Sequence, residues 1–187
     1  MFIQIEDTPN PDTLKFLLNT EIPVAKSGVE FSNSSEAMTS PLAKLLFEVE
    51  GVASVYFGGD FVSVTKVRDI SWDVLRPEVL VVLTDYFSAG KHDASYSGDS
   101  TAEEEEFFDA KDESVVQKIK DLIENYVRPA VAQDGGDIRF RGYKEGVVYV
   151  HLRGACSGCP SAEMTLKDGV YGMLSYYIPE ISAVENV

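Results

Sequence analysis

The sequence predicts an α+β protein that consists of two small α/β-sandwich domains joined by an acidic flexible linker. The first observation behind this prediction is the uneven charge, because residues 91–113 hold nine acids and two lysines among Ser, Gly, Thr and Ala. Such a segment is typical of a solvated, self-repelling linker. The second observation is that residues 1–90 and 114–187 each mix strand-like alternation with apolar residues at helical spacing. A chain of 187 residues has room for two small domains.

The N-terminal domain, residues 1–90, is predicted to contain paired strands. Apolar, β-branched and aromatic residues mark four short segments, at 2–6, 14–18, 52–57 and 61–67. The turn-forming residues Thr8-Pro9-Asn10-Pro11 separate the first two segments. Gly58-Gly59-Asp60 separates the last two, which predicts a hairpin.

Two helices are predicted in the same domain. One begins at Ser40 and has Pro41 in its first turn, where a proline is tolerated. The other follows from apolar residues at helical spacing between Trp72 and Phe87, with Pro77 expected to start or kink it. We expect this aromatic stripe to form core and not a ligand site. This half shows no catalytic constellation.

The C-terminal domain, residues 114–187, is predicted to begin with an amphipathic helix that Ser114 or Asp112 caps. Its apolar face comprises Val115, Ile119, Leu122, Ile123, Tyr126 and Ala130. The helix is expected to end at Gly135-Gly136. A hairpin follows, with strands around 138–140 and 148–152 that alternate apolar and polar residues.

The second strand of this hairpin leads directly into the two cysteines, and Pro160 then opens another helix, which Pro179 ends. The residues expected to pack inward from this helix are Met164, Leu166, Val170, Met173, Leu174, Tyr177 and Ile178. Residues 182–187 are expected to add a short edge strand.

Charge and hydropathy exclude several classes of protein. A net charge of −15 argues against a nucleic-acid binder and against attachment to anionic membranes, because both need a field of Lys and Arg. No run approaches the ~20 apolar residues of a membrane span, and the first residues resemble neither a secretion signal nor a transit peptide. We expect a cytoplasmic protein if the source is bacterial, or one of the mitochondrial matrix if a presequence has been removed.

Cys156 and Cys159 form the pattern that carries chemistry. They are the only two cysteines, so a long-range disulfide is excluded and a reducing compartment is expected. At a strand-to-helix turn, backbone N–H groups and the positive end of a helix dipole favour thiolate. The pair alone fits four uses: an iron–sulfur ligand pair, half of a zinc site, a dithiol redox centre or a soft-metal chaperone loop.

The number of protein ligands that each kind of metal site requires narrows these four possible uses. Zinc and cubane iron–sulfur clusters normally take four protein ligands, and one chain offers two cysteines. His92 and His151 are expected to be surface residues. A second chain must therefore supply the missing pair, most simply across a two-fold axis.

The redox and chaperone uses fit less well. A thioredoxin-type motif usually carries its proline between the cysteines, whereas Pro160 follows the second one. A soft-metal chaperone normally places its cysteines before the first helix. We also expect the flanking Gly154 and Gly158 to leave sulfur exposed, which disfavours a purely structural pair.

Several segments resemble the C-terminal domain of NifU, and the resemblance covers essentially all of residues 114–187. They are Arg128-Pro129-Ala130-Val131-Ala132-Gln133-Asp134-Gly135-Gly136-Asp137, Gly154-Ala155-Cys156-Ser157-Gly158-Cys159-Pro160-Ser161, Thr165-Leu166-Lys167 and Ile178-Pro179-Glu180. Residues 1–90 resemble the accessory N-terminal domain of Nfu-type proteins, through Thr8-Pro9-Asn10-Pro11, Leu14-Lys15-Phe16 and the stretch from Trp72 to Pro77.

The resemblance implies a scaffold or carrier, and not an enzyme, that holds a 4Fe-4S cluster between two subunits and passes it to apo-proteins. Cys156 and Cys159 fall on the family's ligand positions. Implied partners are a second copy of the chain, upstream assembly factors and apo iron–sulfur clients. The chain departs from the family at Tyr171-Gly172, where relatives usually carry an acidic-amide pair. A dithiol oxidoreductase and a zinc-bridged structural dimer remain as alternatives.

Asp134-Gly135-Gly136-Asp137 permits two interpretations. A helix C-cap and turn would need positive φ. Alternatively, the glycines would let the backbone approach the cysteine loop or a partner.

Overall fold

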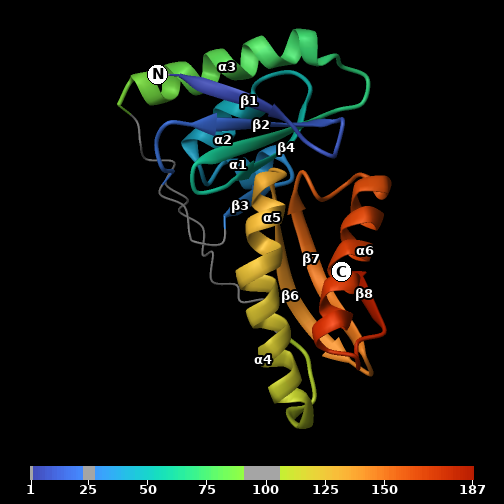
Figure 1. Cartoon of the computed structure of the whole chain (residues 1–187). Helices are drawn as coiled ribbons and strands as arrows, with labels where there is room; N and C mark the ends of the chain where they lie inside the picture. The colour runs from blue at the N-terminus through green and yellow to red at the C-terminus, as the bar shows by residue number, and fades with distance from the viewer. Residues whose placement is uncertain (1, 23–27, 91–105) are drawn as a thin grey trace. The chain divides into compact units, whose positions relative to one another are not determined.

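The computed structural model describes residues 2–22, 28–90 and 106–187. The chain divides into two compact units, Met1–Thr101 and Ala102–Val187 (Figure 1). Each unit has its own hydrophobic core of sheet and helix residues. This mixture of helices and sheets confirms the α+β class. Most of the expected linker, residues 91–105, lies outside the described residues.

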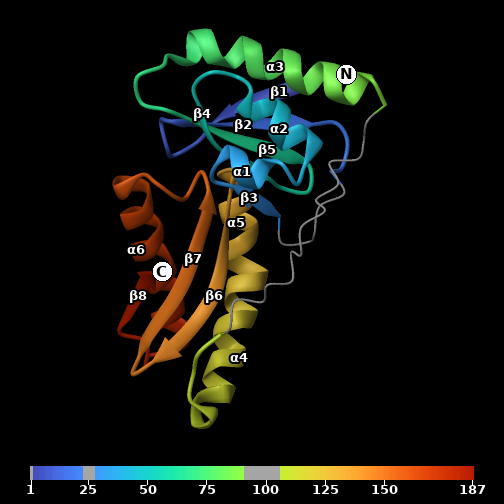
Figure 2. The same cartoon turned by 180° about the vertical axis from the view of Figure 1, so that it is seen from behind.

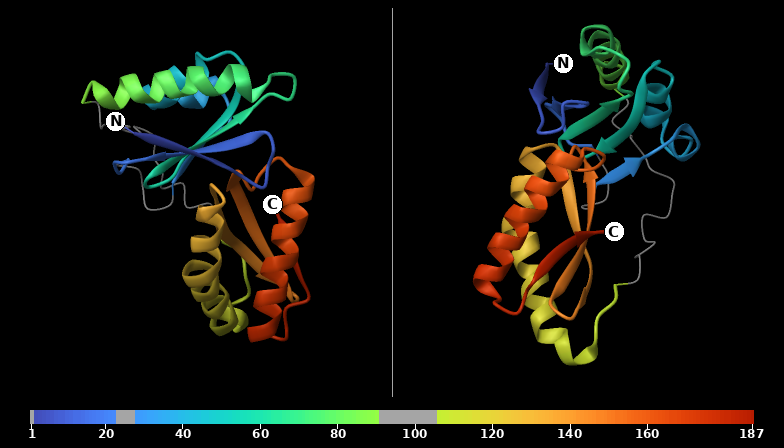
Figure 3. Two further views of the ribbon diagram at one scale, coloured as in Figure 1. Left: turned by 45° about the horizontal axis from the view of Figure 1, so that its top comes forward. Right: turned by 90° about the vertical axis from the view of Figure 1, so that its right-hand side faces the viewer.

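Unit 1 contains a five-stranded antiparallel sheet in the order β1-β2-β5-β4-β3. The strands are β1 (Ile3–Asp7), β2 (Thr13–Leu18), β3 (Val29–Phe31), β4 (Val52–Phe57) and β5 (Phe61–Lys66). The helices are α1 (Ser34–Ala37), α2 (Pro41–Phe47) and α3 (Trp72–Ser88). Helices α2 and α3 pack on one face of the sheet (Figure 3).

The predicted strands and helices of unit 1 are confirmed. Ser40 caps α2 through a hydrogen bond from the Ala43 N–H, and Pro41 occupies the first turn, as expected. Pro77 lies inside α3 and does not start it. The sequence did not predict β3 or α1, since three and four residues are too short to show a period.

Unit 2 is a three-stranded sheet with helices on one face (Figure 3). Strands β6 (Gly136–Lys144) and β7 (Val147–Gly154) form the predicted antiparallel hairpin. Strand β8 (Ala183–Asn186) is the expected edge strand and pairs with β7 in parallel (Figure 2). The helical elements are a 3-10 turn (Ala110–Asp112), α4 (Glu113–Leu122), a π-helical turn (Ile123–Val127), α5 (Arg128–Gln133) and α6 (Pro160–Tyr177).

The π-helical turn changes which residues of the first helix are buried. The buried residues are Val116, Ile119, Ile123, Val127 and Val131, so Tyr126 and Ala130 were wrongly expected on this face. The Arg128 N–H bonds to the Ile123 carbonyl, five residues back, and this widening shifts the inward face. Pro129 supplies a reason, because its ring would clash with the carbonyl four residues earlier in a regular α-helix.

Two further expectations are corrected. Residues 106–113, expected in the linker, belong to unit 2: Phe107 donates to the Arg141 carbonyl (3.1 Å) and accepts from the Tyr143 N–H (2.9 Å). Met164 and Tyr177, expected inside, are exposed on α6. Tyr177 is the last residue of the helix, and Met164 lies outside the stripe that Val170 and Leu174 bury against the sheet.

The separate cores predict that unit 1 responds alone to a cavity in its own core. Leu83 on α3 and Leu174 on α6 are both fully buried leucines in different units. The single tryptophan, Trp72, packs on the core of unit 1, so its fluorescence reports that unit. We expect Leu83→Ala to lower the unfolding free energy that Trp72 reports in urea by about 3 kcal/mol.

Leu174→Ala is the matched control and should leave the Trp72 transition in place while it weakens the unfolding seen by circular dichroism. A Trp72 midpoint that moves equally in both variants would contradict the independence of the cores.

Candidate metal centre at the cysteine loop

The two cysteines lie on the loop between β7 and α6, as the sequence predicts. The loop begins at Gly154 and passes through Gly158, and both have positive φ (64° and 78°), a region that favours glycine. Ser157 closes the turn, since its N–H (3.1 Å) and its hydroxyl (2.9 Å) both donate to the Gly154 carbonyl. Both cysteines are thiols and form no disulfide.

Cys156 is buried, with 6% of its surface exposed, and its sulfur lies against the first residue of β6. A Cβ on Gly136 would lie 2.5 Å from the Cys156 Sγ and 2.8 Å from the Arg153 carbonyl oxygen. Only glycine therefore fits at this position without a shift of the loop.

The sequence suggested two roles for the glycines of the Asp134–Asp137 segment, a helix C-cap and a close approach to the cysteine loop. Each glycine fulfils one of them. Gly135 has φ 81° and ends the helix, where its N–H donates to the Ala132 carbonyl. Its own carbonyl accepts from the Ala155 N–H (3.1 Å), which ties the helix end to the cysteine loop. Gly136 provides the close approach to Cys156.

The burial of Cys156 corrects the expectation that both sulfurs would be exposed, and at this cysteine it also corrects the expectation that thiolate is favoured. Burial, followed by the negative charges of Asp134 and Asp137, raises the pKa of the Cys156 thiol to about 12. At neutral pH this thiol is protonated in the metal-free chain. A metal that binds here must displace the proton.

Cys159 is partly exposed and is the N-cap residue of α6. Its Sγ lies 3.3 Å from the Ser161 hydroxyl. Pro160 follows in the first turn, so the helix starts directly after Cys159.

Glu163 and Asn186 support this end of the loop, and the sequence did not identify either. The Glu163 carboxylate accepts from the Gly158 N–H (3.2 Å) and from the Asn186 amide (3.5 Å). The Asn186 side-chain oxygen in turn accepts from the Leu152 N–H (3.1 Å). An acid in the first turn of a predicted helix was the available signal for Glu163, whereas the role of Asn186 depends on strand pairing.

Arg128 and Asp137 form a largely buried ion pair beside the loop. The Arg128 Nε lies 2.8 Å from one carboxylate oxygen of Asp137 and its Nη2 lies 3.3 Å from the other. The same guanidinium binds Glu124 at 2.7 and 2.8 Å. Burial alone would lower the pKa of Arg128, but these hydrogen bonds raise it overall. The pair fixes the start of β6, one residue after Gly136.

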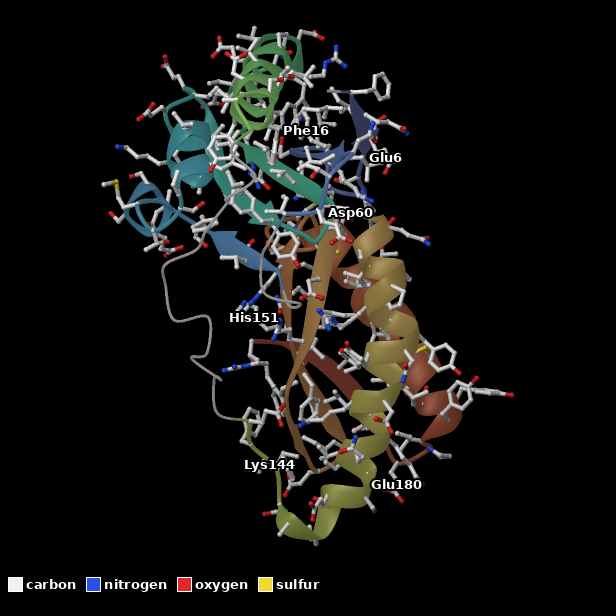
Figure 4. The ribbon with its side chains drawn as sticks, turned by 90° about the vertical axis from the view of Figure 1, so that its left-hand side faces the viewer. Glu6, Phe16, Asp60, Lys144, His151 and Glu180 are labelled. Carbon is white, nitrogen blue, oxygen red and sulfur yellow. The ribbon has the colours of Figure 1, made fainter. Side chains whose placement is uncertain are left out.

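Of the two histidines, the structure describes His151. His151 is on β7 and points away from α4 and α5, on the same sheet face as Arg153 (Figure 4). His92 lies outside the described residues. Among the residues that the structure describes, no group of three or more His, Cys, Asp or Glu side chains is placed to hold a metal ion. Within the same residues, no helix is long and apolar enough to cross a membrane.

The contact at Gly136 predicts opposite effects for two glycine substitutions. Gly136→Ala should lower the unfolding free energy of unit 2 by about 2 kcal/mol, because the new methyl group overpacks the loop. The displaced Cys156 should also react faster with Ellman's reagent. Urea unfolding by circular dichroism and the thiol kinetics measure these effects.

Gly169→Ala is the control, since a Cβ there meets nothing within 4 Å. It should raise stability by up to about 1 kcal/mol through helix propensity and leave the thiol rates unchanged. Equal effects of the two substitutions would refute the steric role of Gly136.

The Arg128–Asp137 pair predicts a large cost for losing the arginine. In Arg128→Gln the buried Asp137 carboxylate loses its close partner and keeps the more distant Arg139, whose Nε lies 3.5 Å away. The substitution should lower the unfolding free energy of unit 2 by about 3 kcal/mol. Adding Asp137→Asn should recover part of that loss. Lys111→Gln is the control, because the Lys111–Asp109 pair is exposed and should contribute nothing measurable. An unchanged midpoint of urea unfolding for Arg128→Gln would contradict the stabilising role of the Arg128–Asp137 pair.

Two family models match the chain. The model described as "Scaffold protein Nfu/NifU N terminal" matches residues 3–90, and the model described as "NifU-like domain" matches residues 119–185. The second match includes both cysteines, the Gly135-Gly136 pair and the Arg128–Asp137 pair. The two models together cover all the strands and helices of unit 1, and those of unit 2 from residue 119, within α4, to residue 185, within β8.

The chain is also similar to individual proteins. The "NFU1 iron-sulfur cluster scaffold homolog, mitochondrial" of Drosophila erecta is 46% identical over 190 residues, covering 100% of this chain and 65% of that protein. The Drosophila virilis homologue is 45% identical over 190 residues, which cover 100% of this chain and 62% of that protein. A solution structure of a NifU-like protein from Saccharomyces cerevisiae is 31% identical, with a TM-score of 0.43 over 49% of this chain and 82% of that one.

The chain thus spans slightly less than two thirds of the curated relatives that it matches. It belongs to the Nfu family of iron–sulfur cluster scaffold proteins, with an Nfu-type N-terminal domain followed by a NifU-like domain that carries Cys156 and Cys159.

Proposed function

We propose that this chain is an iron–sulfur cluster carrier. It holds one 4Fe-4S cluster between two copies of itself, through Cys156 and Cys159 of each, and delivers the cluster to apo-proteins. The observation that carries this proposal is the position of the chain's only two cysteines, both on one loop at the start of α6.

The donor set fits such a cluster. Soft thiolates select iron–sulfur clusters, zinc and Cu(I) over hard cations. A 4Fe-4S cluster takes four thiolates, and one chain supplies two, so a second copy completes the site. Because the four ligands are divided between two subunits, neither subunit holds the cluster alone. A client's own cysteines can therefore compete for the cluster, which allows delivery.

The charge of the C-terminal domain allows two copies to approach. Residues 114–187 carry nine acids and eight bases, although the whole chain has a net charge of −15. A 2+ cubane with four thiolates carries two net negative charges. The first turn of α6, which begins after Cys159, presents the positive end of the helix dipole to that charge.

The remaining parts serve delivery in this proposal. Unit 1 selects clients or stabilises the carrier, and the segment between the units, residues 91–113 in the sequence-based boundaries, lets the two halves move independently. The named relatives are mitochondrial proteins, which supports the mitochondrial matrix as the location. No catalytic step is required of the chain.

Anaerobic reconstitution with iron and sulfide tests the proposal. We expect a brown protein with about four irons and four sulfides per two chains, as for a shared 4Fe-4S cluster. Cys156→Ser and Cys159→Ser should each lose the cluster. Ser175→Ala, on α6 away from the cysteine loop, is the control and should keep it. Absorption spectra and metal analysis provide the readout.

The same measurements separate the alternatives. A colourless protein with one zinc per two chains would identify a structural zinc dimer. Reduction of insulin disulfides without bound iron would identify a dithiol oxidoreductase. A full cluster in Cys156→Ser would also overturn the proposal.

A further inference from the structure

Unit 1 carries an apolar groove between helices α2 and α3. Its apolar lining comes from Leu45 and Val49 on α2 and from Pro77, Val81 and Val82 on α3, and the hollow measures about 460 Å³. Val81 is 59% exposed and Leu45 is 37% exposed, although both are large apolar side chains. This hollow and its lining residues are called the α2–α3 groove.

One exposed stripe of α3 borders the α2–α3 groove. At 100° per residue, the five exposed residues Val74, Pro77, Glu78, Val81 and Asp85 lie within about 100° of one another around the helix. The stripe extends over about 16 Å at 1.5 Å per residue, which is three helical turns. The buried residues of α3, on its other side, are Leu75, Val79, Leu83, Tyr86 and Phe87. The exposed stripe therefore takes no part in the core of unit 1.

The apolar side chains of the groove are mostly stiff. Valine in a helix has one strongly preferred χ1 rotamer, and the proline ring has no rotamers to lose when it is covered. Pro77, Val81 and Val82 provide the α3 side of the groove in this way. A partner that covers them loses little affinity to side-chain ordering, which favours binding.

The charged residues that line the groove are acids. Glu48 and Glu78 line it, and Asp85 follows one turn after Val81 on the exposed stripe of α3. Among the residues that the structure describes, none of these three carboxylates forms an ion pair. Lys44, one turn before Glu48 on α2, is the base closest to them in sequence. The groove is thus complementary to a surface that is apolar in its centre and basic at its sides.

This charge argues against two occupants from the chain itself. Residues 91–105 carry five acids and one lysine, so like charges would oppose one another if this segment lay in the groove. A second copy of residues 1–90 brings thirteen acids and six bases. In a two-fold contact the same patch meets itself, so Glu48 and Glu78 of one copy would face the carboxylates of the other.

We propose that the α2–α3 groove binds a basic amphipathic helix of a partner protein. A helix that lies in a groove presents apolar residues at i, i+3 or i+4, and i+7. About eleven helical residues match the length of the α3 stripe. The apolar side chains of the partner helix cover Leu45 and Val81, and its Lys and Arg side chains reach Glu48 and Glu78.

This inference deepens the proposed function, in which unit 1 selects clients. It rests on that proposal for the role of the partner as a client or an assembly factor. The groove itself is described by unit 1 alone, so its binding can be measured without a cluster.

A model peptide tests the apolar part of the groove in the full chain. The probe is a fluorescein-labelled helix of leucine and lysine, about three turns long, with leucines at i, i+3, i+4 and i+7. Fluorescence anisotropy at an ionic strength of about 0.15 M gives the dissociation constant. We expect Val81→Gln to raise that constant about tenfold, as for an apolar anchor. Val67→Gln is the matched control, because Val67 is a 42% exposed valine outside the groove, and should bind the peptide like the wild type.

Charge reversal tests the electrostatic part. Glu78→Lys should raise the dissociation constant of the leucine–lysine peptide about tenfold, whereas Lys44→Glu should lower it. Asp60→Lys changes the net charge as much as Glu78→Lys does, but at the turn between β4 and β5, and should leave the constant close to the wild-type value. A peptide with glutamate in place of every lysine should not bind.

Several outcomes would overturn the inference. They are equal binding of the leucine–lysine peptide by Val81→Gln and the wild type, and binding of the leucine–glutamate peptide. Self-association of the metal-free wild type that Val81→Gln abolishes would identify a second copy as the occupant. Peptide binding that appears only after residues 91–105 are replaced by Gly and Ser would identify that segment as the occupant.

Circular dichroism of Val81→Gln should match the wild type, because Val81 lies outside the core. The peptide assay needs no iron, so its failure would leave the cluster proposal intact. Failure of the wild type to bind iron and sulfide would instead overturn the proposed function and leave the α2–α3 groove as a binding site.

Discussion

The close contact between Gly136 and the Cys156 sulfur fixes the geometry of the whole C-terminal site. A side chain on residue 136 would meet both the sulfur and the Arg153 carbonyl, so the strand can begin here only with glycine. Gly135 on one side ends the helix, and its carbonyl binds the Ala155 N–H. Asp137 on the other side is anchored by Arg128. Helix, strand and cysteine loop therefore meet at three consecutive residues.

The two cysteines differ in their surroundings although they are three residues apart. Cys156 belongs to the core of unit 2, while Cys159 begins a helix and remains partly exposed. One sulfur is thus held by packing against Gly136, and the other by the start of α6 and the Glu163–Asn186 contacts. A loop anchored at both ends loses little conformational freedom when it binds a cluster, which favours binding.

The sequence predicted the parts that depend on local pattern. Turn residues and alternation located the main strands, and Pro160 and Pro179 bounded α6. The position of the cysteines on a strand-to-helix loop followed from the same pattern. The spacing of the two cysteines and their number implied half of a metal site, because four ligands are needed and one chain supplies two.

The remaining features depend on contacts that a local pattern does not contain. The π-helical turn replaced Tyr126 and Ala130 by Val127 and Val131 on the buried face, because it shifts the phase of the helix. The burial of Cys156 depends on Gly136, which is twenty residues away in sequence. Residues 106–113 looked like linker by charge alone, yet the backbone of Phe107 binds β6.

The pairing of Phe107 also bears on how the outer edge of the unit 2 sheet is covered. Strand β6 is an outer strand of its sheet, and such a strand presents unpaired N–H and C=O groups to which another chain can add. Phe107 occupies two of those groups, at Arg141 and Tyr143, and its ring lies over Gly142 and 5.0 Å from that of Tyr149. The register shift between Phe140 and Gly142 interrupts the regular ladder at the same place. The start of unit 2 thus protects this edge against strand addition and amyloid-like aggregation.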